Sequence, residues 1–507
     1  MGGPPDASPD GANFVCISTD DPDSASTDSN CDGIDGVESD SIFVDGAAGE
    51  DSSIGSRSAP LATISAAIER ASSSGKSSVL IARGTYPESI VLVEGIDLHG
   101  GYNPTTGWSR SLDSVDTHLH GSTSPTMLGA DLAAPTRVSG LDIVGAYVVV
   151  AGASSIAIHL VDVTGLSFED CEVHAGSAGA GVSSVMSSVQ PLPGFPGVAG
   201  GAGTCIGNSG GCSPSNSTVA GRASVPARCD CGEGGGSKAN VFSGDLALAG
   251  ENGTFMSGAL CSASAAQGSP SAGGLGNSGT GQNGQDGTTG TPGAAGSWTD
   301  AFSESGFATA FAGHGGVGGS GGGGGGGGAG SLRLCSNNFV LLGGTGGSGG
   351  GGGCGGVGGA GGQDGGASIG FYLWRSSVAL RSVVIYRGFG GNGGDGALGR
   401  AGGPGGDPGS STPNTTVYCD GLSPPSGGSG GRGGSGGTGG RGGGGAGGVS
   451  VAVLFGESSG LTPTTTNVFV SNEGSQGFGG RGGVPGPDGA FCAGYRIVDE
   501  SCVSVLP

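Results

Sequence analysis

Residues 41–102 alternate between short apolar runs and turns, and one stretch among them has helical spacing. Four apolar residues in that stretch lie three or four positions apart, at Leu61, Ile64, Ile68 and Ala71. Pro60 suits the first turn of a helix, and Gly75 suits its end. We therefore expect an amphipathic helix that opens near residues 58–60 and ends at Gly75.

The segments after this helix are short, rich in branched apolar residues and bounded by turn residues, which is typical of strands. We expect strands at 78–82, 89–93, 96–99, 137–143, 146–150, 156–160, 166–168 and 171–173. Short strands separated by single turns, after one amphipathic helix, predict a capped solenoid of parallel strands.

A set of three apolar residues, spaced nine and then seven positions apart, occurs three times in the chain. The three sets are Ala157, Leu166 and Val173; Ile369, Val378 and Ile385; and Ala452, Leu461 and Val468. Each set runs into glycine-rich sequence. We interpret it as one supersecondary unit that recurs, with long insertions leaving from one corner. Coincidence among apolar residues is the alternative.

The glycine-rich sequence has a period of three. Paired glycines are separated by one other residue in the segments 343–362, 389–407, 426–441 and 478–487. This period matches a polyproline-II-type helix, which has three residues per turn. Two faces of such a helix would be bare backbone, so we expect these GGX tracts to be at least partly ordered and to pack side by side or against the strands of the solenoid. A disordered glycine brush is the alternative.

Composition divides the chain into four parts. Glycine supplies 124 of the 507 residues and only 34% of the residues are apolar, so a conventional core cannot extend throughout. We expect an acidic leader at 1–40, a helix cap and first coils at 41–186, a glycine-rich insertion at 187–367, and later coils with glycine-rich excursions at 368–507. The core should be elongated and discontinuous in sequence.

Charge and cysteine content narrow the class of protein. A net charge of −23 argues against nucleic acid, which requires basic patches. No apolar segment is long enough for a transmembrane helix. The 13 cysteines are dispersed through loop-rich sequence, which is typical of disulfides in an oxidising compartment. Residues 1–15 lack the basic start and apolar stretch of a signal peptide, yet the cysteines favour an extracellular or cell-surface location.

The segment 41–110 resembles the amino-terminal cap and first coils of pectin-lyase-like right-handed parallel β-helix proteins. The residues that carry the resemblance are Gly55, Pro60-Leu61-Ala62-Thr63-Ile64, Ala71, Gly75, Gly84-Thr85-Tyr86, Glu88, Gly95, Gly100-Gly101-Tyr102 and Trp108. The chain is similar to a subgroup of bacterial secreted or surface proteins with an acidic leader and glycine-rich insertions.

This resemblance implies an all-β fold, namely a single-stranded, right-handed parallel β-helix with an N-terminal helix cap and long polyproline-II-like GGX insertions. It does not specify an activity, because the same fold hosts lyases, hydrolases, epimerases, adhesins and structural fibres.

The leader contains a candidate calcium loop. Asp28, Asn30 and Asp32 occupy positions one, three and five of an EF-hand-like loop, Gly33 occupies position six, and Ile34 offers a carbonyl at position seven. Position twelve is a serine instead of a bidentate acid. We therefore expect calcium to bind with modest affinity, and a plain acidic linker is the alternative.

Other polar clusters are weaker candidates. His118-x-His120 places two imidazoles on one face of a strand, but no third metal ligand lies nearby in the sequence. Glu169-Asp170, with Glu172 and His174, could supply paired carboxylates for carbohydrate chemistry, or form an outward-facing strand edge. Gly313-His314-Gly315 matches a polygalacturonase motif by chance, since its companion motifs are missing.

These observations favour a non-catalytic extracellular or cell-surface protein with a structural or adhesive role. Its expected partners are polysaccharides or cell-surface components. A polysaccharide-active enzyme, a lyase or glycoside hydrolase that uses the β-helix groove, is the first alternative. A cation- or ice-binding protein is the second.

Overall fold

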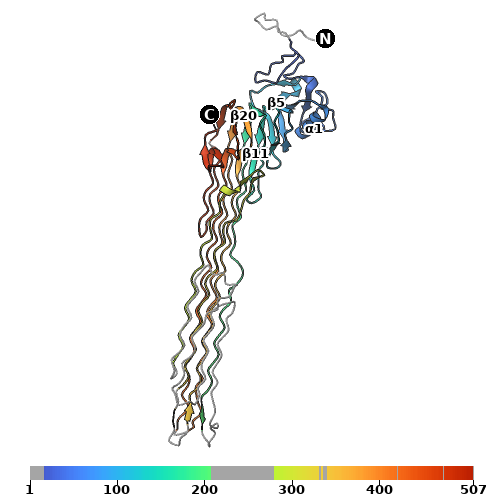
Figure 1. Ribbon diagram of the computed structural model, residues 1–507. Helices are drawn as coiled ribbons and strands as arrows, with labels where there is room; N and C mark the ends of the chain where they lie inside the picture. Colours follow the sequence, from blue (N-terminus) through green and yellow to red (C-terminus); the bar gives the residue numbers. More distant parts are fainter. Residues whose placement is uncertain are drawn as a thin grey trace.

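Residues 16–206, 279–330, 333–334, 340–418, 421–471 and 473–505 are described by the computed structural model. Short strands and one α-helix form a β-rich head, from which a long set of extended segments, here called the stalk, projects on one side (Figure 1). Both the first coils and the end of the chain belong to the head, because the chain returns from the stalk several times.

Among the described residues one segment is α-helical: α1 (Ile64–Ser74) covers the start of the head beside β1 (Ser41–Val44). Its N-terminal N–H groups are satisfied by side chains: Glu88 accepts hydrogen bonds from the N–H of Ile64 at 2.8 Å and of Ser65 at 3.0 Å. Gly75 ends the helix with a φ of +69°, a left-handed conformation that suits glycine.

The predicted start of this helix, near residues 58–60, is four to six residues too early. The N–H of Leu61 donates to the Phe43 carbonyl, and its own carbonyl accepts from Asp45, so this part of the chain pairs with the end of β1 instead of coiling. Thr63 is the N-cap, and its hydroxyl accepts from the N–H of Ala66 at 3.2 Å.

Parallel strands make up most of the head. Its remaining strands are β2 (Ser78–Ala82), β3 (Gly84–Tyr86), β4 (Ile90–Val91), β5 (Asp97–Asn103), β6 (Ser109–Arg110), β7 (Thr117–His120), β8 (Met127–Ala130), β9 (Thr136–Ser139), β10 (Asp142–Val144), β11 (Ser155–Val161), β12 (Leu166–Glu169), β13 (Glu172–His174), β19 (Ser368–Trp374), β20 (Ser377–Tyr386), β21 (Ser450–Phe455), β22 (Gly460–Leu461), β23 (Thr466–Val470), β24 (Phe491–Arg496) and β25 (Ser501–Val503). Short 3-10 turns occur at Glu38–Asp40, Pro104–Thr106 and Thr299–Ala301.

These strands form two sheets. A thirteen-stranded sheet has the order β1-β2-β5-β9-β12-β20-β13-β10-β7-β3, with β6, β22 and β23 attached to its side, and a seven-stranded sheet has the order β25-β24-β21-β19-β11-β8-β4. Within them only β5–β6 and β24–β25 pair antiparallel. The expectation of a mostly parallel, all-β fold is therefore confirmed.

Three strand predictions need correction. The run 137–143 is broken into β9 and β10, because Gly140 adopts a φ of +67° between them and turns the chain. Residues 146–150 form no strand, and Tyr147 at their start is 79% exposed. The run 89–93 shrinks to the two residues of β4.

The threefold repeat is recognisable in the strand register, with two residues out of place. Leu166 pairs with Val378, which pairs with Leu461, and Val173 pairs with Ile385. In the last unit, however, Val470 and not Val468 pairs with Ile385. In the middle unit Ile369 pairs with Ile156, so Gly370 is the position equivalent to Ala157. Because the turns between strands differ in length, a fixed spacing in the sequence cannot identify every pair of residues that lie in register.

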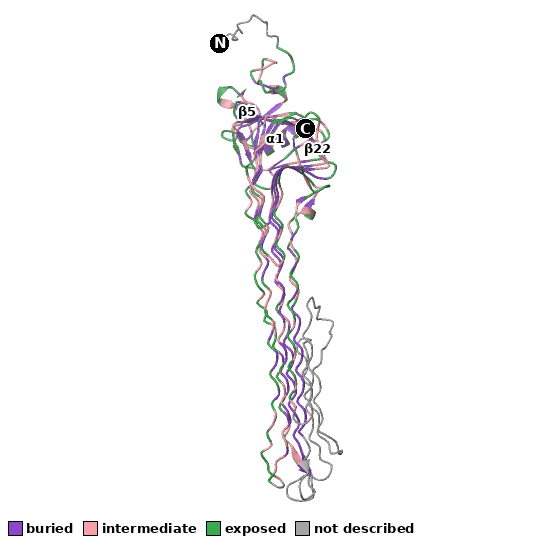
Figure 2. Cartoon of the chain, turned by 90° about the vertical axis from the view of Figure 1, so that its left-hand side faces the viewer, coloured by how far each residue is buried: buried purple, intermediate pink, exposed green. Residues whose placement is uncertain are grey.

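In the described part of the chain, the stalk comprises seven extended tracts, most of them rich in glycine. The tracts lie at 176–203, 279–296, 311–330, 343–366, 388–411, 425–448 and 475–489. Figures 1 and 2 show them running side by side away from the head. At the far end the chain forms a small antiparallel sheet of β14 (Thr204–Ile206), β18 (Val340–Leu342) and β17 (Arg333–Leu334).

Backbone hydrogen bonds join the tracts at every third residue. Between 343–366 and its parallel neighbour 425–448, Gly350 donates to Gly431, Gly353 to Gly434 and Gly356 to Gly437, at 2.8–2.9 Å. The antiparallel neighbour 311–330 donates to 343–366 with the same period, as in Gly321 to Gly353 at 2.9 Å. Donation at every third residue is what a helix with three residues per turn offers to its neighbours.

Close approach explains why two of every three residues are glycine in tracts such as 343–366. A Cβ on Gly352 would lie 1.8 Å from the carbonyl oxygen of Gly321, and one on Gly353 would lie 2.0 Å from that of Gly403. Both distances are far below any van der Waals contact, so no side chain fits at either glycine position.

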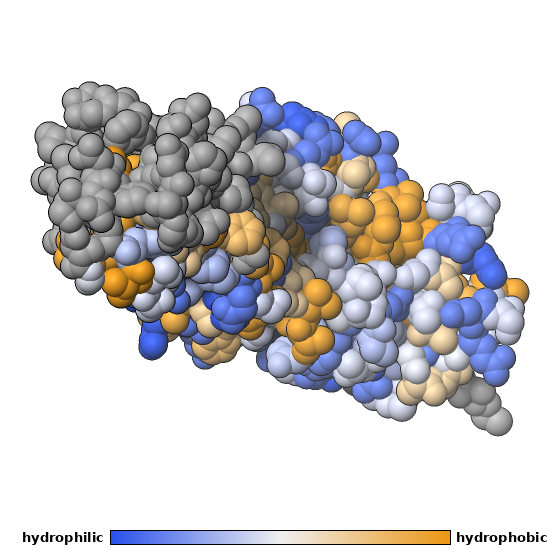
Figure 3. All heavy atoms as spheres, turned by 90° about the horizontal axis from the view of Figure 1, so that it is seen from below, coloured by the Kyte–Doolittle hydropathy of each residue, from blue (hydrophilic) through white to orange (hydrophobic). Residues whose placement is uncertain are grey.

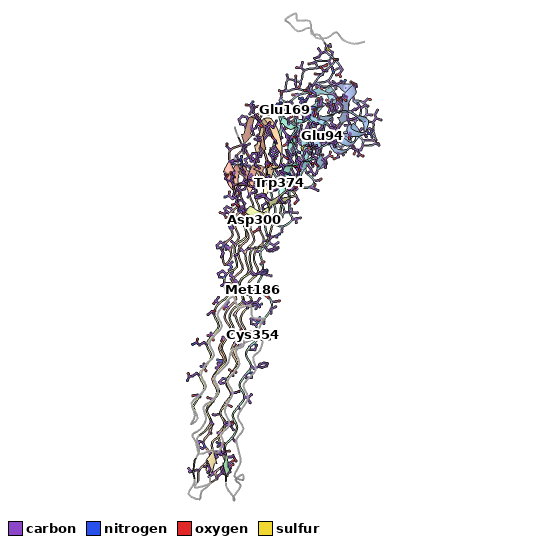
Figure 4. All side chains as sticks on the ribbon, in the orientation of Figure 1. Glu94, Glu169, Met186, Asp300, Cys354 and Trp374 are labelled. Atoms are coloured by element: carbon purple, nitrogen blue, oxygen red, sulfur yellow. A yellow bond between two sulfur atoms is a disulfide. The ribbon has the colours of Figure 1, made fainter. Side chains whose placement is uncertain are left out.

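Side chains at the third position point outward or fill small interior sites. Ser348 and Thr345 are fully buried, and their hydroxyls accept hydrogen bonds from the N–H groups of Val198 and Gly201 at 2.8 and 2.7 Å. Cys354 also lies inside the stalk, whereas Met186 is partly exposed on an outer tract (Figure 4). Viewed from below, apolar and hydrophilic side chains are interspersed on the surface (Figure 3).

Candidate functional site

The predicted calcium loop forms a tight turn closed by the Cys16–Cys31 disulfide. The Asp28 carboxylate accepts hydrogen bonds from the N–H groups of Asp32 at 3.2 Å and Gly33 at 2.9 Å. Asn30 Oδ1 also accepts from the Asp32 N–H, at 2.9 Å. Three of the predicted ligand residues, Asp28, Asn30 and Asp32, thus lie around one turn.

The fourth predicted ligand residue, Ile34, anchors the loop to the head. Its side chain is buried in a small cluster with Phe43, Leu80, Tyr102 and Trp108. Its N–H donates to Asp32 Oδ1 at 3.2 Å, while Asp32 Oδ2 accepts from the N–H of Glu38 at 2.9 Å. The acid nearest to position twelve, Glu38, is paired with Arg57 at 3.1 Å, so it does not turn into the loop.

A buried ion pair fixes the loop further. Arg110 Nη1 lies 3.2 Å from Asp35 Oδ2, and both side chains are 1% exposed. The same guanidinium donates to the carbonyl oxygens of Asp23 at 3.0 Å and Gly100 at 2.9 Å and to Ser139 Oγ at 2.8 Å. Burial raises the pKa of Asp35 to about 6, although Arg110 acts in the opposite direction.

A second group of polar side chains lies along three neighbouring strands of the thirteen-stranded sheet. The parallel register of β7, β10 and β13 places His118, Asp142 and Glu172 side by side, and two residues further on it aligns His120 with His174. Side chains two apart on a strand share a face. The two His-containing motifs, distant in sequence, therefore meet on one face of the sheet.

Asp142 is the centre of this group. Its Oδ2 lies 2.7 Å from His118 Nδ1, and its Oδ1 lies 3.4 Å from His174 Nε2. His174 Nε2 also lies 3.6 Å from Glu172 Oε2. The ring of His174 stacks on Tyr386 of the next strand, with ring centroids 4.1 Å apart. We call Asp142, Glu172 and His174, with His118 behind them, the histidine–carboxylate ladder.

Burial is uneven within the ladder. The side chain of Asp142 is 11% exposed, whereas those of His118, Glu172 and His174 are each more than one-third exposed. Asp142 Oδ1 is inaccessible and has no hydrogen-bond donor. Together with His120, the ladder contains two sets of potential metal-ligand atoms, and within each set all atoms lie within 4.8 Å of one another. One set comes from His118, His120 and Asp142, and the other comes from Asp142, Glu172 and His174.

Sequence reasoning missed Asp142, the residue that joins the two motifs. Asp142 had been expected inside one continuous strand at 137–143, and only the corner at Gly140 and the register with β7 and β13 reveal its neighbours. The signal available in the sequence was the acidic residue Asp142 directly after Gly140-Leu141, where a glycine permits the chain to turn.

The other candidate acids lie elsewhere. Glu169 is paired with Arg381 at 2.6 Å and lies 3.8 Å from Arg137, on the head (Figure 4). Asp170 accepts a hydrogen bond from the Ser24 hydroxyl at 2.8 Å. His314 is exposed on the stalk tract 311–330. The Gly313-His314-Gly315 sequence is therefore part of the glycine-rich pattern of that tract.

Comparison with other proteins adds no further assignment. None of the helices in the described part of the chain has the length and apolar character needed to cross a membrane. No known protein family, curated protein or solved structure matches the chain.

Proposed function

We propose that the protein is a non-catalytic extracellular or cell-surface protein whose head is a pectin-lyase-like, right-handed parallel β-helix and whose stalk holds the head at a distance from a second surface. Parallel pairing between strands that are two or more elements apart in the chain, together with the capping helix α1, supports the fold assignment. The observation that carries the functional proposal is the stalk, because its tracts satisfy one another's backbone groups at every third residue.

The dimensions and chemistry of the stalk suit a spacer. The tract 343–366 contains 24 residues, which at a rise of roughly 3.1 Å per residue spans about 70 Å. In tracts such as 343–366 two of every three positions are backbone only, so these tracts offer few side chains for catalysis. A rigid element of this length would hold the head at a distance from a second surface, as a structural or adhesive protein requires.

The partners we propose are polysaccharides or other cell-surface components. The acidic surface, with a net charge of −23, disfavours nucleic acid and anionic membranes. Two disulfides among the described residues, Cys16–Cys31 and Cys492–Cys502, are compatible with an oxidising location.

A glycan array combined with polysaccharide digestion tests this proposal. We expect the full chain to bind a subset of glycans and to release no reducing or unsaturated sugars from them. Immunogold electron microscopy should place the protein at the cell surface. Turnover of any polysaccharide would establish the enzymatic alternative, and a cytoplasmic label would contradict the proposed role.

Calcium binding by the leader is a further part of this proposal. Asp28, Asn30, Asp32 and the Ile34 carbonyl would supply the ligands, since an oxygen that accepts one N–H keeps a second lone pair. With Glu38 held by Arg57, the dissociation constant should be on the order of 10⁻⁴–10⁻³ M, as in extracellular modules.

Calorimetry on the full chain should therefore detect calcium binding in the millimolar range, and Asp32→Ala should abolish it. Asp113→Ala removes the same charge from an exposed site elsewhere on the head and should bind like the unmodified protein. Equal binding by the Asp32→Ala variant, or no heat at millimolar calcium, would leave the leader as an acidic linker.

A further inference from the structure

We propose that Asp142, Glu172 and His174 form a binding site for a divalent first-row transition metal, with zinc as the reference ion. The site lies on the face of the thirteen-stranded sheet where β10 and β13 pair in parallel. This inference is independent of the structural role proposed above and of the calcium loop in the leader.

The spacing of the three ligand atoms carries the proposal. His174 Nε2 lies 3.4 Å from Asp142 Oδ1 and 3.6 Å from Glu172 Oε2. Zinc binds nitrogen and carboxylate oxygen at about 2.0–2.2 Å in tetrahedral geometry, which separates neighbouring ligands by roughly 3.3–3.6 Å. The two separations measured from His174 Nε2 thus already match those of a tetrahedral ion, and the ligand atoms of the three residues all lie within 4.8 Å of one another.

The environment of Asp142 provides a second, independent observation. The side chain of this residue is 11% exposed, and its Oδ1 has no solvent contact and accepts no hydrogen bond, although His174 Nε2 lies 3.4 Å away. A buried carboxylate oxygen that accepts no hydrogen bond is costly to the fold. A cation placed between Oδ1, His174 and Glu172 would remove that cost, because it supplies the missing positive charge.

Two neighbouring rings hold the ligands in place. His118 Nδ1 lies 2.7 Å from Asp142 Oδ2, the carboxylate oxygen that is not assigned to the proposed ion. Tyr386 stacks on His174 with an angle of 10° between the ring planes, which fixes the orientation of Nε2. Outer partners of this kind orient metal ligands and contribute to affinity.

The donor set determines the class of metal. Calcium and magnesium prefer all-oxygen sites, whereas an imidazole with two carboxylates suits zinc and its first-row neighbours. Three protein ligands leave a fourth position for water or an external donor. The more than one-third exposure of Glu172 and His174 leaves that position open to solvent.

Metal binding can be measured on the untagged full chain by calorimetry and by metal analysis after dialysis. We expect one zinc ion per chain at this site and no displacement by millimolar calcium or magnesium. His174→Ala and Glu172→Gln should each remove this ion, and both residues are exposed enough for the head to keep its thermal stability. Cobalt bound in place of zinc should give the intense visible absorption of a tetrahedral centre.

Two further variants separate a metal site from general surface binding. His118→Ala should weaken zinc binding by about 10–100-fold, as expected for an outer partner. His314→Ala removes an exposed imidazole from the stalk and should leave binding unchanged. The proposal is overturned if zinc remains bound in the His174→Ala and Glu172→Gln variants, if His314→Ala removes it, or if no zinc is retained by the folded protein.

Discussion

Replacing Gly437 by alanine should open the stalk locally and expose it to trypsin. Gly437 donates its N–H to Gly319 at 2.7 Å, and a Cβ on it would lie 1.9 Å from the carbonyl oxygen of Thr288. The neighbouring tract would have to move by about 1.5 Å to reach ordinary contact. Several hydrogen bonds on either side would then be lost.

The expected size of this effect follows from the number of bonds. At about 1 kcal/mol for each hydrogen bond, opening three or four of them costs roughly 3–4 kcal/mol and raises the open population on the order of 10²–10³-fold. Cleavage after Arg432 and Arg441, which flank the site, should accelerate by a similar factor when opening is fast relative to cleavage.

Thr438→Ala is the matched control for this experiment. Thr438 is the adjacent residue, its side chain is exposed, and its backbone carbonyl still accepts from Gly290. Cleavage of this variant should proceed at the rate of the unmodified protein. Equal rates for Gly437→Ala and Thr438→Ala would mean that the tracts do not pack as closely as described.

Replacing Arg110 by methionine should strongly destabilise the junction between leader and head. The substitution leaves the buried Asp35 carboxylate without its counter-charge and removes donors from two backbone carbonyls. Loss of one partner of a buried ion pair typically costs about 3–5 kcal/mol. Urea unfolding at pH 7 should show this loss, whereas Arg381→Met, at an exposed pair with Glu169, should cost under about 1 kcal/mol.

The pH dependence of stability at this junction distinguishes the contribution of Asp35 from that of Arg110. The pKa of Asp35 is about 6 in the folded protein against an ordinary 3.8, so the folded state binds the extra proton between these values. The stabilisation that this proton provides to the folded state is therefore fully present below pH 4 and is lost as the pH rises through 6. The difference in the free energy of unfolding is roughly 3 kcal/mol.

Asp35→Asn mimics the protonated form, so at pH 7 it should cost much less than Arg110→Met. The loss in the Arg110→Met variant should itself shrink between pH 7 and pH 5, since a neutral Asp35 needs no counter-charge. A loss that is independent of pH, or a larger loss for Asp35→Asn, would contradict this account of the junction.

Local signals in the sequence predicted the start of the head well. Gly75 ends α1, and the apolar run after it is β2, because these features depend on a few neighbouring residues. Leu61 shows the limit of such reasoning: its helical spacing was real, yet pairing with β1 took precedence. Register was predictable only where turn lengths repeat, as at Leu166, Val378 and Leu461.

The histidine–carboxylate ladder could be predicted only in part. His118-x-His120 and the pair Glu172 and His174 were visible as strand-face motifs, but each lacked a partner in its own segment. Asp142 supplies that partner through strand pairing across 24 and 30 residues of sequence. Such long-range register depends on corners like the one at Gly140, whose conformation a single sequence does not specify.

Hydrogen exchange of the stalk amides tests the central claim most directly. Followed by mass spectrometry on the full chain, the amides of residues 343–362 and 426–441 should be protected for as long as those of β11 and β19 in the head, because each tract donates to two neighbours. Exchange of these glycine amides at the rates of an unfolded chain, with the head still protected, would show that the stalk is a flexible brush and would contradict the proposal of a rigid spacer.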